Sequence, residues 1–141
     1  MTETKPPFMN YRALLLGALL LAALSLGMIA LALLLDVQKA TAPQLLTLSA
    51  LWIAPALFSA LKATDGRLLH GMVMGLIGAL LLSLLISLMR SLNPQILILQ
   101  QLGGDKSLMV MILGGLWGSI GGLFAEIVHL RRTRKARQQR R

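Results

Sequence analysis

The sequence contains no cysteine, and it has few acidic or aromatic residues. The absence of cysteine excludes disulfide bonds and thiol chemistry. Charged residues make up 13% of the chain, against about a quarter in soluble domains, whereas hydrophobic residues make up 56%. The sequence has no phosphate-binding loop, no Gly-x-Ser-x-Gly motif and no His-Glu-x-x-His motif. We therefore expect a protein without enzymatic activity and without a cofactor.

Long apolar runs account for most of the chain. They cover residues 13–35, 45–61, 68–89 and 108–125 and are 23, 17, 22 and 18 residues long. A membrane-spanning helix needs about 20 predominantly apolar residues, and flanking residues lengthen the second run sufficiently. We therefore predict an all-α integral membrane bundle with four transmembrane helices at about 11–35, 43–63, 67–90 and 107–130. A polar arm (1–10) precedes this transmembrane domain (11–130), and a basic tail (131–141) follows it.

The first run has a second interpretation, as a cleaved signal peptide. Basic residues precede it, and the small residues Ala30 and Ala32 resemble a cleavage site. Its apolar core is, however, much longer than the 7–15 residues of a signal peptide, so we predict a retained span.

Basic residues are distributed unevenly between the two sides of the predicted bundle. The N-terminal arm, the loop between the second and third runs and the tail carry eleven of the 14 Lys and Arg residues. The positive-inside rule therefore predicts that both termini are cytoplasmic. We expect a multi-pass protein of a bacterial inner membrane. Because the net charge of +9 lies mostly in the tail, it does not indicate a nucleic-acid-binding domain.

Small residues recur at every fourth position in the third and fourth runs. On a helix this spacing places them on one narrow face, where two backbones can approach closely in lipid. The small residues are Gly71, Gly75, Ala79, Ser83 and Ser87 in the third run, and Gly114, Gly118 and Gly122 in the fourth. We therefore predict that these two helices form the tight pair of the bundle, as in a glycine zipper.

Two prolines predict local features of the helices. Pro55 lies inside the second predicted helix and removes the hydrogen bond to the carbonyl of Leu51, so we predict a kink that is either a static bend or a hinge. In the loop between the third and fourth runs, Asn93 is a candidate N-cap and Pro94 a candidate first helical residue. We predict a short helix at about 94–102, lying in the outer membrane interface.

Three titratable residues near the inner ends of the last two helices form a candidate polar site: His70, Glu126 and His129. Glu126 is the only acidic residue within a span, and such a residue is a functional candidate by default. One interpretation is a proton-handling or metal site, because metal-binding bundles use the Glu-x-x-His spacing. The other is an interfacial ion pair of Glu126 with Arg67 or Lys62. Known di-metal bundles need two such motifs and further carboxylates in their helices, whereas this chain has one motif, so we expect no bound metal.

The basic tail follows the fourth helix directly. Clusters of this size beside a span bind anionic lipid headgroups, and we predict that role for the tail. Its basic residues are Arg131, Arg132, Arg134, Lys135, Arg137, Arg140 and Arg141. An arm for ribosomal RNA or for an acidic partner is the alternative. Because the tail has no aromatic residue for base stacking, we expect no specific nucleic-acid binding.

Two segments carry a resemblance to a known family. One is residues 66–71, Gly-Arg-Leu-Leu-His-Gly, leading into Gly75, and the other is the pair of Gly-Gly dipeptides at 114–115 and 121–122. Together they resemble the YrzE-like proteins, small four-helix membrane proteins of bacteria. The resemblance covers less than half of the chain, and it implies four helices, cytoplasmic termini and no established activity. The second helix departs from that pattern, with Trp52 and Pro55 where glycines are expected.

These observations favour a non-enzymatic accessory, assembly or scaffold subunit. Its partners are the lipid bilayer, anionic headgroups, and other membrane subunits or further copies of itself. The alternative is a small oligomeric channel or transporter, with Ser83 and Ser87 along a path and Glu126 and His70 at its inner mouth.

Overall fold

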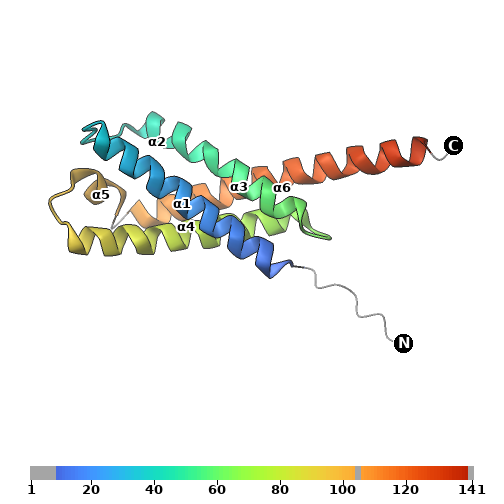
Figure 1. The fold of residues 1–141 in the computed structure, drawn as a ribbon, viewed down its shortest axis with the longest axis horizontal. Coiled ribbons are helices and arrows are strands. Elements are labelled where there is room, and N and C mark those ends of the chain that lie inside the picture. The colour runs from blue at the N-terminus through green and yellow to red at the C-terminus, as the bar shows by residue number, and fades with distance from the viewer. Residues whose placement is uncertain (1–8, 104–105, 140–141) are drawn as a thin grey trace.

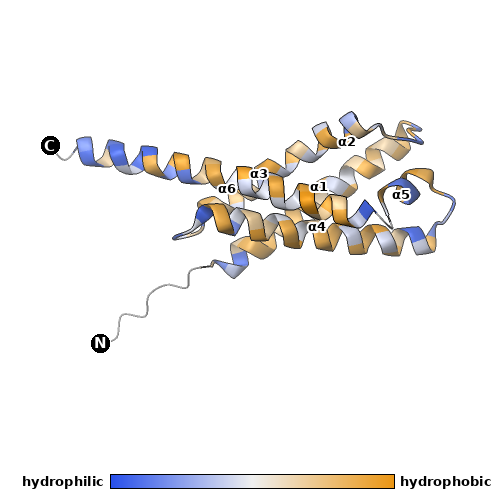
Figure 2. Ribbon diagram, turned by 180° about the vertical axis from the view of Figure 1, so that it is seen from behind, coloured by the Kyte–Doolittle hydropathy of each residue, from blue (hydrophilic) through white to orange (hydrophobic). Residues whose placement is uncertain are grey.

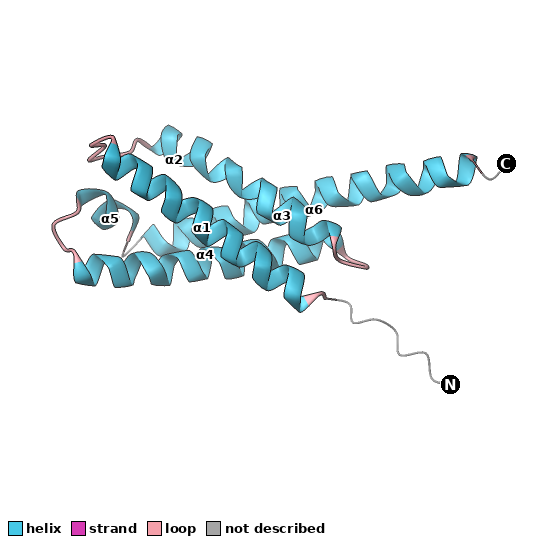
Figure 3. Ribbon diagram, in the orientation of Figure 1, coloured by secondary structure: helices cyan, strands magenta, loops and turns pink. Residues whose placement is uncertain are grey.

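The computed structural model describes residues 9–103 and 106–139, and it is all-helical over them, with no strand (Figure 3). Four segments are long and apolar enough to span a membrane: Tyr11–Leu34, Ala42–Leu61, Arg67–Leu92 and Ser107–Gln138. The predicted four-helix fold is therefore confirmed. The elements are α1 (Tyr11–Leu34), α2 (Ala42–Ser49), the 3-10 turn η1 (Ala50–Trp52), α3 (Ile53–Leu61), α4 (Arg67–Leu92), α5 (Leu97–Leu102) and α6 (Ser107–Gln138).

The long helices form one bundle in which α4 and α6 make the most extensive contact (Figure 1). Helix α3 packs on α6, and α1 packs on α4 and α3. The beginning of α1, the end of α3 and the beginning of α4 lie at one end of the bundle, which we call the basic end (Figure 1). The opposite end, which carries α5, is the α5 end. Leucine side chains cover much of the outer surface, as expected for helices that face lipid.

Helix α6 continues beyond the bundle. The predicted fourth span ends near residue 130, but α6 runs without a break to Gln138, and its last turns are hydrophilic (Figure 2). The sequence Arg-Arg-Thr-Arg-Lys-Ala-Arg-Gln contains no glycine or proline and consists mostly of good helix formers, so nothing in it ends the helix. At 1.5 Å per residue, residues 131–138 extend α6 by about 12 Å. We call this segment the basic arm. Arg140 and Arg141 lie outside the described residues, as do residues 1–8 of the N-terminal arm.

The second span is interrupted rather than continuous. Helix α2 ends at Ser49, η1 covers Ala50–Trp52, and α3 begins at Ile53. Pro55 follows η1 by three residues, and it has no N–H to donate to the carbonyl of Leu51, so the regular ladder fails at this point. As a result, α2 diverges from the bundle, and Ser49 is its only buried residue (Figure 1).

Helix α5 begins at Leu97, three residues later than predicted. Asn93 caps the end of α4, where its N–H donates to the carbonyl of Met89, and its own carbonyl accepts from the N–H of Ile96. Pro94 therefore lies in a turn instead of at the first helical position. The side chains of Ile98 and Leu99 are buried, so α5 is anchored to the bundle.

Candidate functional site

The backbones of α4 and α6 touch at their glycines. A Cβ atom built on Gly71 would lie 2.8 Å from the Cα of Gly122, and it would overlap the carbonyl oxygen of Gly118. A Cβ atom on Gly75 would overlap the carbonyl oxygen of Gly114 and lie 3.0 Å from the Cα of Gly118. Side chains cannot be accommodated at these positions without moving one helix. All five glycines are buried, so the contact lies inside the bundle.

The small-residue stripe of α4 leaves this contact towards the α5 end. Ala79 is fully buried, and its Cβ faces Gly114. Ser83 is only half-buried, and Ser87 is exposed. The stripe therefore packs against α6 over its first three members.

Glycines outside the two stripes bring the other helices together. A Cβ atom on Gly17 of α1 would lie 2.8 Å from the Cβ of Ser59 in α3. On Gly121 of α6 it would lie 2.5 Å from the Cβ of Ala56 in α3. Gly121 sits beside the Gly122 stripe position in sequence but faces another helix, because consecutive residues point about 100° apart around a helix.

A buried hydrogen-bonded group connects three helices near the basic end. The hydroxyl of Ser59 in α3 donates to the carbonyl of Ala13 in α1 at 2.8 Å and lies 3.0 Å from Nε2 of His70 in α4. Because its one hydrogen goes to Ala13, Ser59 accepts the second bond, so His70 carries its proton on Nε2. Ser59 and His70 are both almost completely buried. The sequence did not single out Ser59, although a serine inside a membrane span is a candidate for a hydrogen bond between helices.

Arg67 lies one turn before His70 and pairs with α6. Its Nη1 is 3.7 Å from Oε2 of Glu126. Arg67 was one of the two partners considered for Glu126 from the sequence, and the other, Lys62, has its ammonium 4.4 Å above the ring centroid of Phe58. The Glu126 side chain is 39% exposed, so its carboxylate remains in contact with the surroundings of the bundle.

The three predicted polar residues have separate surroundings. His70 bonds Ser59, Glu126 pairs with Arg67, and His129 is half-buried one turn further along α6. Among the described residues, no three His, Cys, Asp or Glu side chains lie together as a metal site. Within this part of the chain, Nε of Arg67 and Nδ1 of His70 are buried without a hydrogen-bond partner. The arrangement can hold α1, α3, α4 and α6 in register. Nδ1 of His70 remains able to accept a hydrogen bond from a water molecule or to bind a proton.

Two tryptophans, Trp52 and Trp117, make matched contacts between helices. The indole N–H of Trp52 donates to the hydroxyl of Ser25 in α1 at 2.9 Å. The indole N–H of Trp117 in α6 donates to the hydroxyl of Ser49 in α2, also at 2.9 Å. A buried tryptophan needs an acceptor for its N–H, and serine is one of few available in an apolar span. These bonds attach α1 and α6 to the two sides of η1.

The basic residues of the arm are all exposed, namely Arg131, Arg132, Arg134, Lys135 and Arg137. They follow the apolar part of α6 without a loop, and Figure 2 shows them projecting beyond the apolar bundle. Their charges are therefore presented on a helix at the end of the bundle.

No family model, curated protein or solved structure matches the chain. The resemblance to the YrzE-like proteins stays a prediction.

Proposed function

We propose that the protein is a non-enzymatic accessory or scaffold subunit that fixes a rigid basic arm at the face of a membrane. The observation that carries this proposal is the continuity of α6, which runs from the glycine contact with α4 into the basic arm without a break. A helix clamped over Gly114, Gly118 and Gly122 holds its projecting end in a defined position. Such an end suits the recruitment or assembly of another component.

The interior polar groups support a structural role. His70, Ser59 and the carbonyl of Ala13 bond one another, and Arg67 pairs with Glu126. Interactions of this kind hold helices together in lipid, where an unbonded polar group is costly.

The basic arm is the proposed contact with other molecules. We infer that the basic end lies on the cytoplasmic side of a bacterial plasma membrane, because most Lys and Arg residues lie at that end. Anionic headgroups attract each nearby charge by about 1 kcal/mol, and an acidic surface on a partner subunit can replace them. Partner subunits then bind to the arm and to the leucine-rich outer faces of the helices.

Affinity purification from native membranes in mild detergent tests this proposal. We expect the protein to copurify with a larger complex at fixed stoichiometry, measured by mass spectrometry together with particle mass. Changing all five described arm cations to Gln should release the partners. Replacing Lys39 and Arg90 at the α5 end by Gln is the control and should leave the complex intact. A lone protein or a homo-oligomer from native membranes would overturn the accessory role.

A small channel or transporter is the second candidate. It is favoured by three buried polar atoms of α4 that have no hydrogen-bond partner among the described residues: Nε of Arg67, Nδ1 of His70 and Oγ of Ser83. Groups of this kind can serve a passing ion or proton. Flux measurements in liposomes test this candidate, with loss of flux in Glu126→Gln expected if Glu126 lies at its inner mouth.

A further inference from the structure

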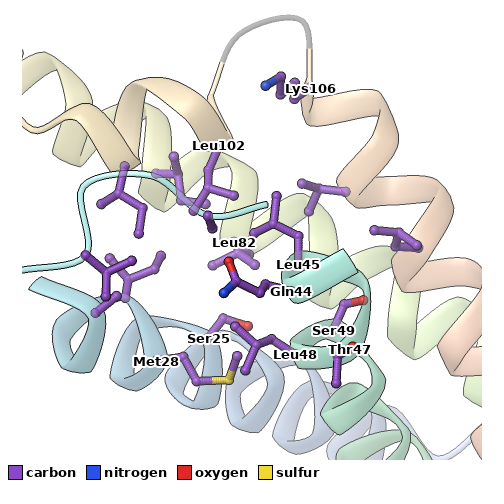
Figure 4. Close-up of a pocket in the computed structure, with 18 of the residues that line it drawn as sticks. Ser25, Met28, Gln44, Leu45, Thr47, Leu48, Ser49, Leu82, Leu102 and Lys106 are labelled. Carbon is purple, nitrogen blue, oxygen red and sulfur yellow. The ribbon is translucent and has the colours of Figure 1, made fainter. Parts of the chain in front are cut away.

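The divergence of α2 leaves a cavity of about 570 Å³ at the α5 end of the bundle (Figure 4). Its walls come from α1, α2, η1, α4, α5 and α6 and include the buried residues Leu82 and Trp52, with Lys106 just before α6. The volume is that of sites that hold small organic molecules. The cavity runs along α2 and η1 from Pro43 to Trp52, a length of about 14 Å at 1.5 Å per residue.

The walls are apolar, and their hydroxyl groups are already engaged. Ser25 accepts from Trp52, Ser49 accepts from Trp117, and Thr47 donates to the carbonyl of Pro43. Met28, Leu45 and Leu48 supply further apolar surface (Figure 4). Water would find few groups to bond inside, and an empty space would forfeit dispersion contacts along its lining. A hydrocarbon chain satisfies such a lining.

A positive charge lies at one end of this hydrocarbon-lined space. Lys106 lines the cavity from the first residue before α6, where the apolar part of the helix begins (Figure 4). In a bilayer that position corresponds to the headgroup level, while Trp52 and Leu82 lie at acyl-chain depth. An amphiphile with a negative head and a long apolar chain therefore matches the cavity in both charge and polarity.

The rim above the cavity is a built structure. The side-chain amide of Gln101 in α5 forms two hydrogen bonds with the backbone of Ala40, with Oε1 accepting from the Ala40 N–H at 3.0 Å and Nε2 donating to its carbonyl at 2.6 Å. These two hydrogen bonds fix the loop between α1 and α2 over α5. Ala40 is itself a lining residue, so the mouth of the cavity is held in place.

We propose that this cavity binds one acyl chain of an anionic phospholipid from the surrounding bilayer, with the headgroup phosphate at Lys106. The chain lies between α1 and α2 and fills the space that the break at η1 opens. A volume of about 570 Å³ over the length of the cavity leaves a space narrower than a transmembrane helix of a second protein, which measures about 10–12 Å across with its side chains. The proposal is independent of the scaffold role and of the basic arm, which lies at the other end.

Quenching of tryptophan fluorescence tests the proposal in the full-length protein. The chain has two tryptophans, and only Trp52 lines the cavity. Trp117→Phe leaves Trp52 as the single tryptophan, so the fluorescence reports on the cavity alone. The probe is phosphatidylglycerol with brominated acyl chains, titrated into phosphatidylcholine nanodiscs. We expect saturable quenching of Trp52 at low mole fractions of the probe. Quenching that only rises gradually, in proportion to the mole fraction of the probe, would overturn the proposal.

Blocking the cavity distinguishes a bound chain from lipid that merely surrounds the bundle. In the Trp117→Phe background, Ala32→Phe adds bulk to the α1 wall, whereas Ala30→Phe adds the same bulk to an exposed position of α1. We expect Ala32→Phe to abolish the saturable quenching and Ala30→Phe to retain it. Retention in both variants would overturn the proposal. A two-copy particle mass that Ala32→Phe reduces to one copy would assign the cavity to a second protomer and would also overturn it.

The headgroup part of the proposal has its own variant. Lys106→Gln should weaken the preference for brominated phosphatidylglycerol over brominated phosphatidylcholine by about five-fold, which corresponds to about 1 kcal/mol for one charge near the surface. Lys39→Gln is the control, because Lys39 is exposed at the same end but does not line the cavity. An unchanged preference in Lys106→Gln, or an equal loss in Lys39→Gln, would overturn the assignment of the phosphate to Lys106.

Discussion

Gly75 and Gly114 meet backbone to backbone, so that a Cβ atom on Gly75 would overlap the carbonyl oxygen of Gly114. The obstacle is main chain and not the end of a flexible side chain, so it cannot move aside without displacing a helix. In lipid this close approach replaces the hydrophobic effect as the source of helix association, because leucine gains nothing by leaving acyl chains for protein.

The first prediction concerns this contact. Gly75→Ala should lower the free energy of unfolding in detergent micelles by about 1–3 kcal/mol, the usual cost of overpacking, and Gly75→Leu should prevent folding. Gly27→Ala is the control, since nothing lies within 4 Å of a Cβ atom built there. We expect it to be neutral or slightly stabilising because alanine is the better helix former. Equal effects at positions 27 and 75 would contradict the contact.

The second prediction concerns the bond between Ser59 and His70. Ser59→Ala removes the acceptor for the Nε2 proton and the donor for the Ala13 carbonyl at once. Because hydrogen bonds within membrane bundles are modest, we expect a loss of about 0.6–2 kcal/mol in the free energy of unfolding. Ser91→Ala, which removes an exposed hydroxyl bonded only within its own helix, should change stability far less. An unchanged free energy of unfolding in Ser59→Ala would show that these hydrogen bonds do not stabilise the bundle.

The third prediction concerns the ion pair of Arg67 and Glu126. With a 3.7 Å separation and a Glu126 side chain that is 39% exposed, the pair should contribute no more than about 1 kcal/mol. A double-mutant cycle with Glu126→Gln and Arg67→Gln measures this coupling, and added salt should reduce it. A coupling of several kcal/mol would place the pair in a drier environment than its exposure indicates.

The fourth prediction concerns orientation. Because the chain has no cysteine, single cysteines can be introduced without first removing others. We expect a membrane-impermeant maleimide to label Lys39→Cys on intact cells and to label Ala136→Cys only after permeabilisation. The reverse pattern would place the basic arm outside and contradict the positive-inside assignment.

Much of this fold was accessible from the sequence, and the reason is the solvent. A bilayer requires about 20 apolar residues for each helix, so the four runs predicted the number of long helices and all of their limits except the last to within two residues. The sequence was less informative about where a helix ends. The predicted end near residue 130 reflected hydropathy, which marks where a helix leaves the membrane and not where it ends, and α6 continues to Gln138.

The partners of the polar residues were less accessible. Depth along the helices placed His70 near Glu126, but the side chain of His70 points to Ser59 in α3. The helix toward which a side chain points depends on how the helices are rotated against one another. Because hydropathy is nearly uniform around α4, the sequence does not show this rotation. The Trp52–Ser25 and Trp117–Ser49 bonds were missed for the same reason.

By itself, the sequence determined the class of the protein, the number of its spans and the small-residue faces available for close packing, because each follows from the composition of single helices in lipid. Tertiary structure alone decided which glycines face which helix, how Ser59 and Arg67 bond, and that the break before Pro55 opens a cavity beside α2. These features depend on the rotation and separation of helices, which are set when several faces pack at once.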